Sequence, residues 1–92
     1  GYSDLIVIYI AAKQGESFQG YDLLQILLAA GFRFGEMSIF HRYEKPNGDG
    51  EKLFSLASAS DPGTFDIHHM GVFSCKGLCP FMQLSSEYHN EK

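Results

Sequence analysis

Tryptophan is absent from this 92-residue chain, and cysteine, proline and positively charged residues are few. Seven Lys and Arg residues stand against eleven Asp and Glu residues, which gives a net charge of −4. The positive residues are scattered along the sequence, whereas proteins that bind a nucleic-acid backbone cluster them. The composition therefore argues against nucleic acid as a partner.

Long hydrophobic runs are also missing. The longest apolar run covers residues 5–12, whereas a membrane-spanning helix needs about 20 residues. We therefore expect neither a membrane-crossing segment nor a signal peptide in this sequence. Apolar residues make up 45% of the chain and charged residues 20%, which is typical of a globular protein. The length predicts a single domain.

The two cysteines do not form a recognisable metal or redox motif. Cys75 and Cys79 are separated by three residues, a spacing that belongs to no common zinc or disulfide-exchange pattern. His68 and His69 precede them, but consecutive side chains point in different directions in a strand or a helix. We predict two reduced thiols, no metal site and no cofactor.

The N-terminal third of the chain predicts a strand followed by a helix. Residues 4–12 have the Ile and Val content of a strand that is apolar on both faces. Residues 21–30 form an amphipathic pattern, and Gly31 is the expected residue after the helix C-terminus. The leucines that share one helical stripe are Leu23, Leu24, Leu27 and Leu28.

The rest of the chain predicts further strands. A short extended piece between Gly31 and Gly35 leads to residues 37–43 and 52–60, which predict an antiparallel hairpin around the turn PNGDG. Thr64 is the expected cap of a short helical turn. Residues 78–84 then form a last strand, and the whole order predicts an α+β domain.

Strand parity predicts an apolar second face on this sheet. Side chains alternate between the two faces of a strand, and Phe40, Phe54 and Leu56 fit the core face. One helix of useful length is available to cover a face, so the opposite face should be a shallow apolar depression. Such a surface usually marks a protein or ligand contact, although another segment or a second subunit would cover it equally well. Its residues are Leu5, Val7, Met37, Ile39, Ala57, Ala59, Cys79 and Phe81.

The sequence does not predict a catalytic site. His41 should face the depression while Arg42 points to the opposite face, and neither a nucleophile nor a carboxylate pair has suitable spacing. We expect His41 to be a structural hydrogen-bonding residue and the chain not to be an enzyme. A sheet-face RNA-binding module, with Phe81 and Tyr9 stacking on bases, is the alternative, but its basic rim is missing.

Five segments of the chain form a recognisable pattern: FGEM at 34–37, IFHR at 39–42, LFSLA at 53–57, PGTFD at 62–66 and FMQ at 81–83. On these segments, residues 31–66 resemble the central signature of the ZipA C-terminal domain family of bacterial cell-division proteins. The resemblance extends over nearly the whole chain, and the family domain is longer. It predicts that residues 1–92 are one domain equivalent to the N-terminal part, roughly two thirds, of a ZipA-type FtsZ-binding domain.

The resemblance implies a fold, a partner and a location. The fold is a split β-α-β antiparallel sheet with helices on one face and an exposed apolar face. The function is a non-enzymatic adaptor that binds the C-terminal tail peptide of FtsZ, the tubulin-like division protein, in a shallow groove. Members are anchored by an N-terminal helix, so this domain would act at the cytoplasmic face of the bacterial inner membrane, at the division site, without touching the membrane itself. The groove positions carried over are Leu5, Met37, Ile39, Ala57, Ala59, Cys79 and Phe81.

Two positions depart from the family pattern. A bulkier apolar residue is usual where Ala59 stands, and a lysine is usual where Asp61 stands. The chain also carries an extra residue between Asp66 and Phe73. Asp61 therefore joins the peptide-binding candidates, and we expect an altered charge preference at its end of the groove.

Overall fold

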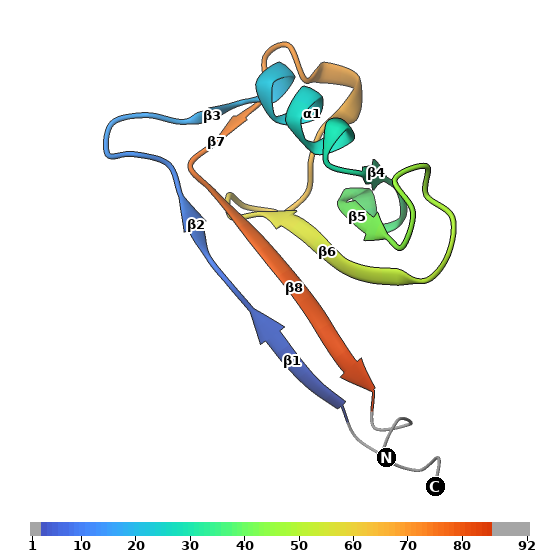
Figure 1. Cartoon of the computed structure of the whole chain (residues 1–92). Helices are drawn as coiled ribbons and strands as arrows, with labels where there is room; N and C mark the ends of the chain where they lie inside the picture. The colour runs from blue at the N-terminus through green and yellow to red at the C-terminus, as the bar shows by residue number, and fades with distance from the viewer. Residues whose placement is uncertain (1–2, 86–92) are drawn as a thin grey trace, which may run out of the picture.

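The computed structural model describes the backbone of residues 3–85 and the side chains of residues 5–82. A six-stranded antiparallel sheet has the order β1-β8-β6-β5-β4, and β2 also pairs with β8. Figure 1 shows β1 and β8 as a long ribbon that extends away from the other elements. The strands are β1 (Ser3–Val7), β2 (Ile10–Ala11), β4 (Phe32–Phe34), β5 (Phe40–Tyr43), β6 (Lys52–Ser58) and β8 (Gly77–Ser85).

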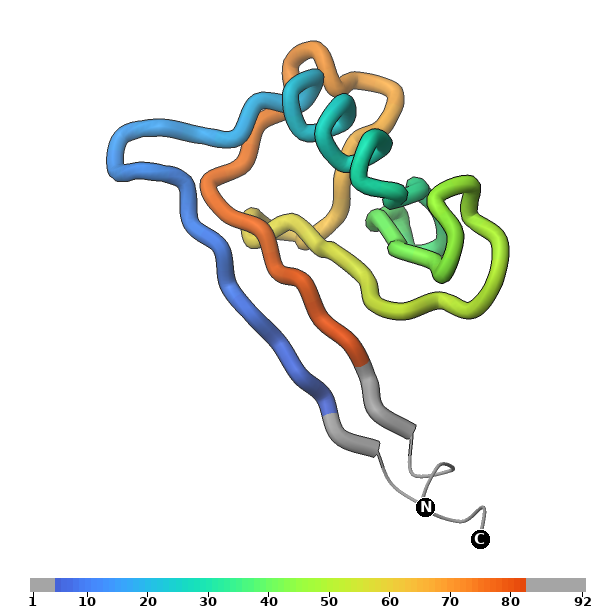
Figure 2. The backbone as a smooth tube through the Cα atoms, in the orientation of Figure 1, coloured from blue at the N-terminus to red at the C-terminus, as the bar shows by residue number. Residues whose placement is uncertain are grey.

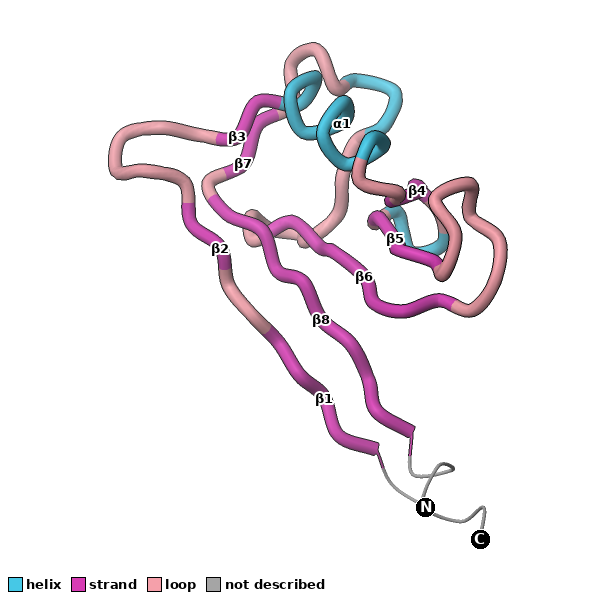
Figure 3. Tube along the Cα trace, viewed as in Figure 1, coloured by secondary structure: helices cyan, strands magenta, loops and turns pink. Residues whose placement is uncertain are grey.

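The helical segments gather at one end of the molecule, away from the tip of the β1–β8 ribbon (Figure 3). They are the α-helix α1 (Gly20–Ala29) and the 3-10 turns η1 (Glu36–Ser38) and η2 (Ile67–His69). A separate two-stranded sheet pairs β3 (Phe18–Gln19) with β7 (Ser74–Cys75). The predicted α+β class with an antiparallel sheet is confirmed. Within residues 3–85, no helix is long and apolar enough to cross a membrane.

Helix α1 lies where the leucine pattern predicts it. Leu23 and Leu27 are buried and Leu24 is half-buried. Gly31 has a φ of +94° and donates its backbone N–H to the Leu28 carbonyl over 3.1 Å, so it is the predicted residue after the helix. The prediction that Leu28 belongs to the buried stripe is wrong, since it is 43% exposed. Leu23 and Leu27 join the buried core cluster, whereas Leu28 lies outside it.

The core lies between α1 and the adjoining end of the sheet. Phe40 is its centre, because this side chain is fully buried and contacts the rings of Phe34 and Phe65 edge-on at centroid distances of 5.5 and 5.0 Å. Edge-on aromatic pairs of this kind add to the free energy gained by burial. The buried cluster consists of Leu23, Leu27, Phe32, Phe40, Leu56, Phe65, Cys75 and Leu78.

The strand register confirms the predicted sorting of side chains into two faces. Phe40 pairs with Leu56, which pairs with Pro80, and these residues lie on the core face. His41 pairs with Ser55, which pairs with Phe81, so these residues lie on the opposite face. We call that opposite face, which carries His41, Ser55, Phe81 and Val7, the open face.

Four predicted boundaries are wrong, and one of them is the end of the strand predicted over residues 52–60, which is Ser58. Strand β5 begins at Phe40 rather than at Met37, because residues 36–38 form η1. Thr64 does not cap a helical turn, since η2 begins at Ile67 and Asp66 is the residue before it. The first predicted strand is divided into β1 and β2, although the Ile8 N–H still donates to the Pro80 carbonyl over 3.0 Å.

Strand β1 is an edge strand within residues 3–85, because it pairs with β8 alone. Every side chain from residue 5 to residue 9 is between 44% and 62% exposed, and all five are apolar or aromatic. An edge strand that continues into an uncharged stretch of exposed apolar side chains is a template for pairing with another strand.

We expect the 92-residue chain to self-associate through the free edge of β1. Ile8 directly follows β1. Ile8→Lys should lower the association, because a lysine next to an edge strand opposes the addition of a second strand. Sedimentation velocity at increasing protein concentration measures the effect. Ile26→Lys on α1 is the matched control, since Ile26 is 64% exposed and lies outside the sheet. A single monomeric species at all concentrations would contradict the expectation.

Candidate functional site

A groove of about 220 Å³ lies on the open face, where β6 leaves β8. The two strands pair only from Ser55 with Phe81 to Ser58 with Leu78, and β8 then continues with β1 as a two-stranded ribbon. Figure 2 shows the two strands separating beyond this point. The side chains that line this open-face groove are Met37, Ile39, His41, Lys52, Leu53, Phe54, Ser55, Phe81 and Met82.

The floor of the groove is buried and its rim is exposed. Ile39 is 4% exposed, and His41 and Ser55 are also buried, whereas Met37 is 74% exposed. The expectation that Ile39 is an exposed groove residue is therefore wrong in one respect: it lines the groove from below. The chain reverses through η1, where the Gly35 N–H donates to the Ile39 carbonyl over 3.0 Å, and this reversal places Ile39 under the rim.

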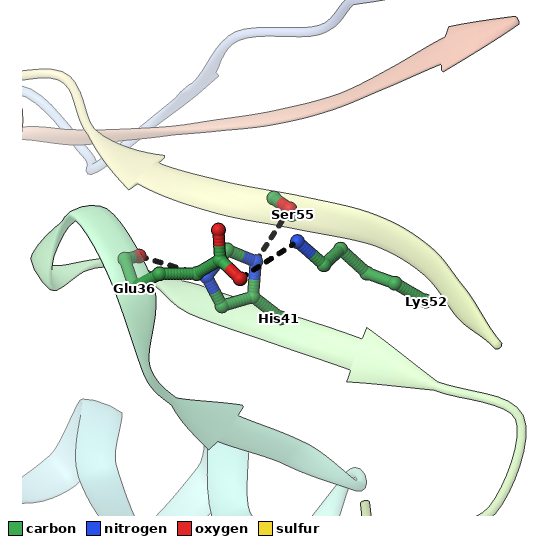
Figure 4. Close-up of polar contacts among 4 residues, drawn as sticks. All are labelled: Glu36, His41, Lys52 and Ser55. Atoms are coloured by element: carbon green, nitrogen blue, oxygen red, sulfur yellow. Dashed lines mark hydrogen bonds and ion pairs between the residues drawn. The ribbon is translucent and has the colours of Figure 1, made fainter. Parts of the chain in front are cut away.

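His41 is held by two hydrogen bonds within the fold (Figure 4). Its Nε2 lies 2.9 Å from the Glu36 carbonyl oxygen, and its Nδ1 lies 2.7 Å from Ser55 Oγ. A carbonyl oxygen can only accept, so Nε2 carries a proton, and in the neutral ring Nδ1 accepts from the Ser55 hydroxyl. The prediction of a structural hydrogen-bonding role is confirmed, since both ring nitrogens are engaged in bonds that fix η1 to β5 and β6.

Met37 stands at the rim in a backbone conformation that side-chain-bearing residues avoid. Its φ is 64°, and the φ of Ser38 is 57°. A left-handed conformation costs roughly 1–2 kcal/mol for a residue with a Cβ atom. The turn is held by hydrogen bonds from the Ser38 N–H to the Gly35 carbonyl and from the Phe65 N–H to the Ser38 carbonyl, of 3.1 and 2.9 Å. The fold thus maintains a strained turn that presents an apolar side chain to water.

The other predicted site residues spread from the groove over the open face. Leu5 and Val7 are exposed on β1, and Ala57 pairs with Cys79 in the middle of the face, where both are half-buried. Small side chains thus lie between the large ones, as parity predicts. Phe81 is half-buried and lines the groove itself.

Ala59 and Asp61 lie beyond the end of β6. Ala59 is exposed, and its N–H donates to the Gly77 carbonyl over 3.0 Å. Asp61 is also exposed, and it lines a separate, more polar depression of about 330 Å³ together with Ser38, Ser58, Ser60, Pro62, Thr64, Phe65, Asp66 and Phe73. The structure therefore brings Met37, Ile39 and Phe81 together but leaves Asp61 outside the groove lining.

Four groove residues escaped sequence reasoning: Lys52, Leu53, Phe54 and Met82. Phe54, Phe81 and Met82 also line a depression of about 230 Å³ on the core face, together with Ile6, Ile8 and Pro80. They reach both faces because β6 and β8 diverge there, and parity within a strand does not reveal where two strands part.

The cysteines lie apart from the groove lining. Cys75 is buried in the core cluster, Cys79 is half-buried, and both are free thiols. His69 is exposed, with its Nδ1 3.0 Å from Asp66 Oδ1. Among the residues that the structure describes, no group of three or more His, Cys, Asp or Glu side chains is arranged to hold a metal ion.

We expect Ser55→Ala to lower the free energy of unfolding by about 1–3 kcal/mol, because it leaves the buried Nδ1 of His41 without a hydrogen-bond partner. Urea denaturation measures this loss. Ser74→Ala removes the same hydroxyl from an exposed position on β7 and should change the stability little. Equal losses in the two variants would show that the His41–Ser55 bond contributes nothing.

The fold and the groove together define a class of protein. This is a small α+β domain whose antiparallel sheet is covered by a helix at one end of one face and carries an apolar groove on the other face. An exposed apolar groove of this kind, with a flexible methionine at its rim, is typical of domains that bind peptide segments.

Comparison with known proteins identifies the family. A sequence model described as "ZipA, C-terminal FtsZ-binding domain" matches residues 4–92. The chain therefore belongs to the family of ZipA C-terminal domains. This family consists of cell-division proteins and is not a known enzyme family.

Three relatives illustrate the similarity, and each is named cell division protein ZipA. The protein of Ectopseudomonas mendocina is 44% identical over 86 residues, which cover 94% of this chain and 32% of the relative. That of Shewanella sediminis is 44% identical over 81 residues (88% and 24%), and that of Azotobacter vinelandii is 43% identical over 86 residues (94% and 30%). The chain spans roughly a quarter to a third of the length of these relatives.

Proposed function

We propose that this domain is a non-enzymatic cell-division adaptor that binds the C-terminal tail peptide of FtsZ in the open-face groove. Its place would be the cytoplasmic face of the bacterial inner membrane at the division site, where it helps to tether the Z ring during septation. The family description supports FtsZ as the partner. The tail peptide and the groove are the finer part of the proposal, and their support comes from the geometry of the open face.

One observation carries the proposal: Met37 is 74% exposed and is held in a left-handed conformation. Strained backbone persists where the surrounding structure enforces it, and such sites are concentrated where proteins function. Met37 adds little to the core, since most of its side chain lies in water. Burial against a docked peptide would give this methionine the apolar contacts that the free domain does not provide.

The dimensions of the open face suit a partly helical peptide. A helix with its side chains is about 10 Å across, and neighbouring strands are about 4.8 Å apart, so a docked helix would cover two or three strands. The groove runs over β5, β6 and β8, with Ile39 and Phe81 positioned to receive apolar side chains. The small side chains of Ala57 and Cys79 would let the peptide backbone approach the sheet.

The proposal excludes nucleic acid as the partner of this face and includes no membrane contact by this segment. The net charge of −4 opposes a phosphate backbone. Among the side chains that line the groove, Lys52 is the single positively charged one. RNA binding would lose affinity steeply as salt is added, whereas apolar peptide binding would change little.

The direct test is an NMR titration of the chain with a peptide of about 15 residues from the C-terminus of FtsZ, taken from Ectopseudomonas mendocina. We expect chemical-shift changes at Met37, Ile39 and Phe81. Phe81→Ala should weaken binding about tenfold, the lower part of the range for burying such a side chain. Asp49→Ala, in the hairpin turn, should leave the affinity unchanged. Shift changes confined to residues outside the open face would contradict the proposed groove.

A second test separates binding from folding at Met37. Met37→Gly should raise the free energy of unfolding by up to about 1 kcal/mol, because glycine adopts a positive φ without steric cost. The same change should weaken binding of the FtsZ peptide several-fold, since the apolar rim is lost. Thermal denaturation and titration calorimetry measure the two effects.

Phe40→Ala is the control for a substitution that destabilises the fold. It should cost about 3–5 kcal/mol of stability, because it empties the centre of the core. If Met37→Gly lowered the stability as well, the rim methionine would belong to the fold rather than to the binding site.

A further inference from the structure

The rim of the open-face groove carries one loosely held ion pair. Lys52 Nζ lies 3.8 Å from Glu36 Oε2, and the two side chains are 38% and 72% exposed. Figure 4 shows the pair crossing from β6 to η1 beside the His41–Ser55 hydrogen bond. Glu36 immediately precedes the rim residue Met37 in the chain, and Lys52 is itself part of the groove lining.

This ion pair is one that another carboxylate can replace at low cost. Exposed pairs between a lysine and a carboxylate contribute little to stability, because water solvates both partners and both long side chains lose rotamer freedom. A lysine ammonium also has three donors and turns freely on its stem. Lys52 is therefore a positive charge at an apolar groove, held by a partner that it exchanges easily.

We propose that Lys52 is a specificity residue that binds a carboxylate of the docked peptide, and that Glu36 occupies Lys52 in the free domain and is displaced on binding. This inference rests on the proposed function of the groove. It adds the chemistry of the partner. The peptide would carry an acidic group next to the apolar side chains that it places in the groove beside Ile39 and Phe81.

The exchange is favourable because docking changes the surroundings of Lys52. An apolar peptide segment over the groove removes water from the rim, and an ion pair is stronger where the effective dielectric constant is lower. A charge-assisted hydrogen bond formed there outweighs the exposed pair that it replaces. The net charge of −4 repels an acidic peptide at a distance, but salt at physiological strength screens this repulsion beyond about 8 Å. The local charge of Lys52 therefore determines whether the groove prefers a peptide with an acidic group at this position.

Titration calorimetry of the full chain with the Ectopseudomonas mendocina FtsZ tail peptide tests the exchange. We expect Lys52→Gln to weaken binding about three- to tenfold and Glu36→Gln to strengthen it about two- to threefold. The double variant should bind like Lys52→Gln alone, because Glu36 acts through Lys52. Lys45→Gln and Glu16→Gln are matched controls that make the same charge changes at exposed positions outside the groove.

The source of the carboxylate is identified with altered peptides. One peptide carries a C-terminal amide, and the others replace single Asp or Glu residues by the corresponding amides. The peptide that loses affinity for the wild-type chain, but loses none for Lys52→Gln, contains the interacting carboxylate. Circular dichroism checks that each protein variant is folded.

The possible results distinguish a failure of the proposed groove function from a failure of the proposed role of Lys52. Failure of the wild-type chain to bind the peptide would overturn both the function and the role of Lys52. Binding in the groove with Lys52→Gln indistinguishable from Lys45→Gln would overturn the role of Lys52 alone. A gain from Glu36→Gln that persists in the Lys52→Gln background would also overturn it, because the effect would then be general repulsion rather than exchange.

Discussion

The pairing of β6 with β8 over four residues, from Ser55 to Ser58, is the constraint on which both faces of this domain depend. Its register places Leu56 toward the core and Ser55 and Ala57 toward the open face. The point where this pairing stops is equally important, because β8 continues with β1 beyond it while β6 turns away (Figure 1). The depressions on the two faces lie at this same fork and share Phe54, Phe81 and Met82. The groove thus forms where two strands of the sheet diverge, and not under a loop that crosses the sheet.

The polar residues in the floor of the groove can be buried because they form hydrogen bonds within the fold. His41 and Ser55 are both buried, and no described buried side-chain polar atom lacks a hydrogen-bond partner. Burial without these bonds would cost more than an apolar floor of the same shape. The bond from His41 to the Glu36 carbonyl has a second effect, since it fastens η1 to the sheet. The position of the rim therefore depends on a histidine in the floor.

Sequence reasoning found the faces but not the turn that shapes the groove. Parity succeeded for Phe40 and His41, because alternation in a strand is a geometric property that survives small errors in strand boundaries. The strand assignment failed at Met37, although this residue does line the groove, because the apolar run after Gly35 is typical of a strand and the left-handed turn depends on a hydrogen bond from distant Phe65. Lys52 was missed because the β5–β6 register shifts between Arg42 and Tyr43. Two-residue strands such as β3 and β7 carry no periodicity to detect.

Residues of η1 contribute to the groove in three ways, and some of these contacts stabilise the fold while others form the proposed binding surface. Glu36 supplies the carbonyl that accepts from His41 and the carboxylate beside Lys52, and the next residue, Met37, supplies the apolar rim. The backbone strain at Met37 and Ser38 is maintained by bonds to the floor and to the segment that carries Phe65. A change that loosens the floor would therefore release the rim without altering any residue proposed to contact the peptide. In the proposed complex the strained turn would already be fixed before the peptide arrives, so binding would not need to order it, and this preorganisation would lower the entropic cost of docking at an otherwise shallow surface.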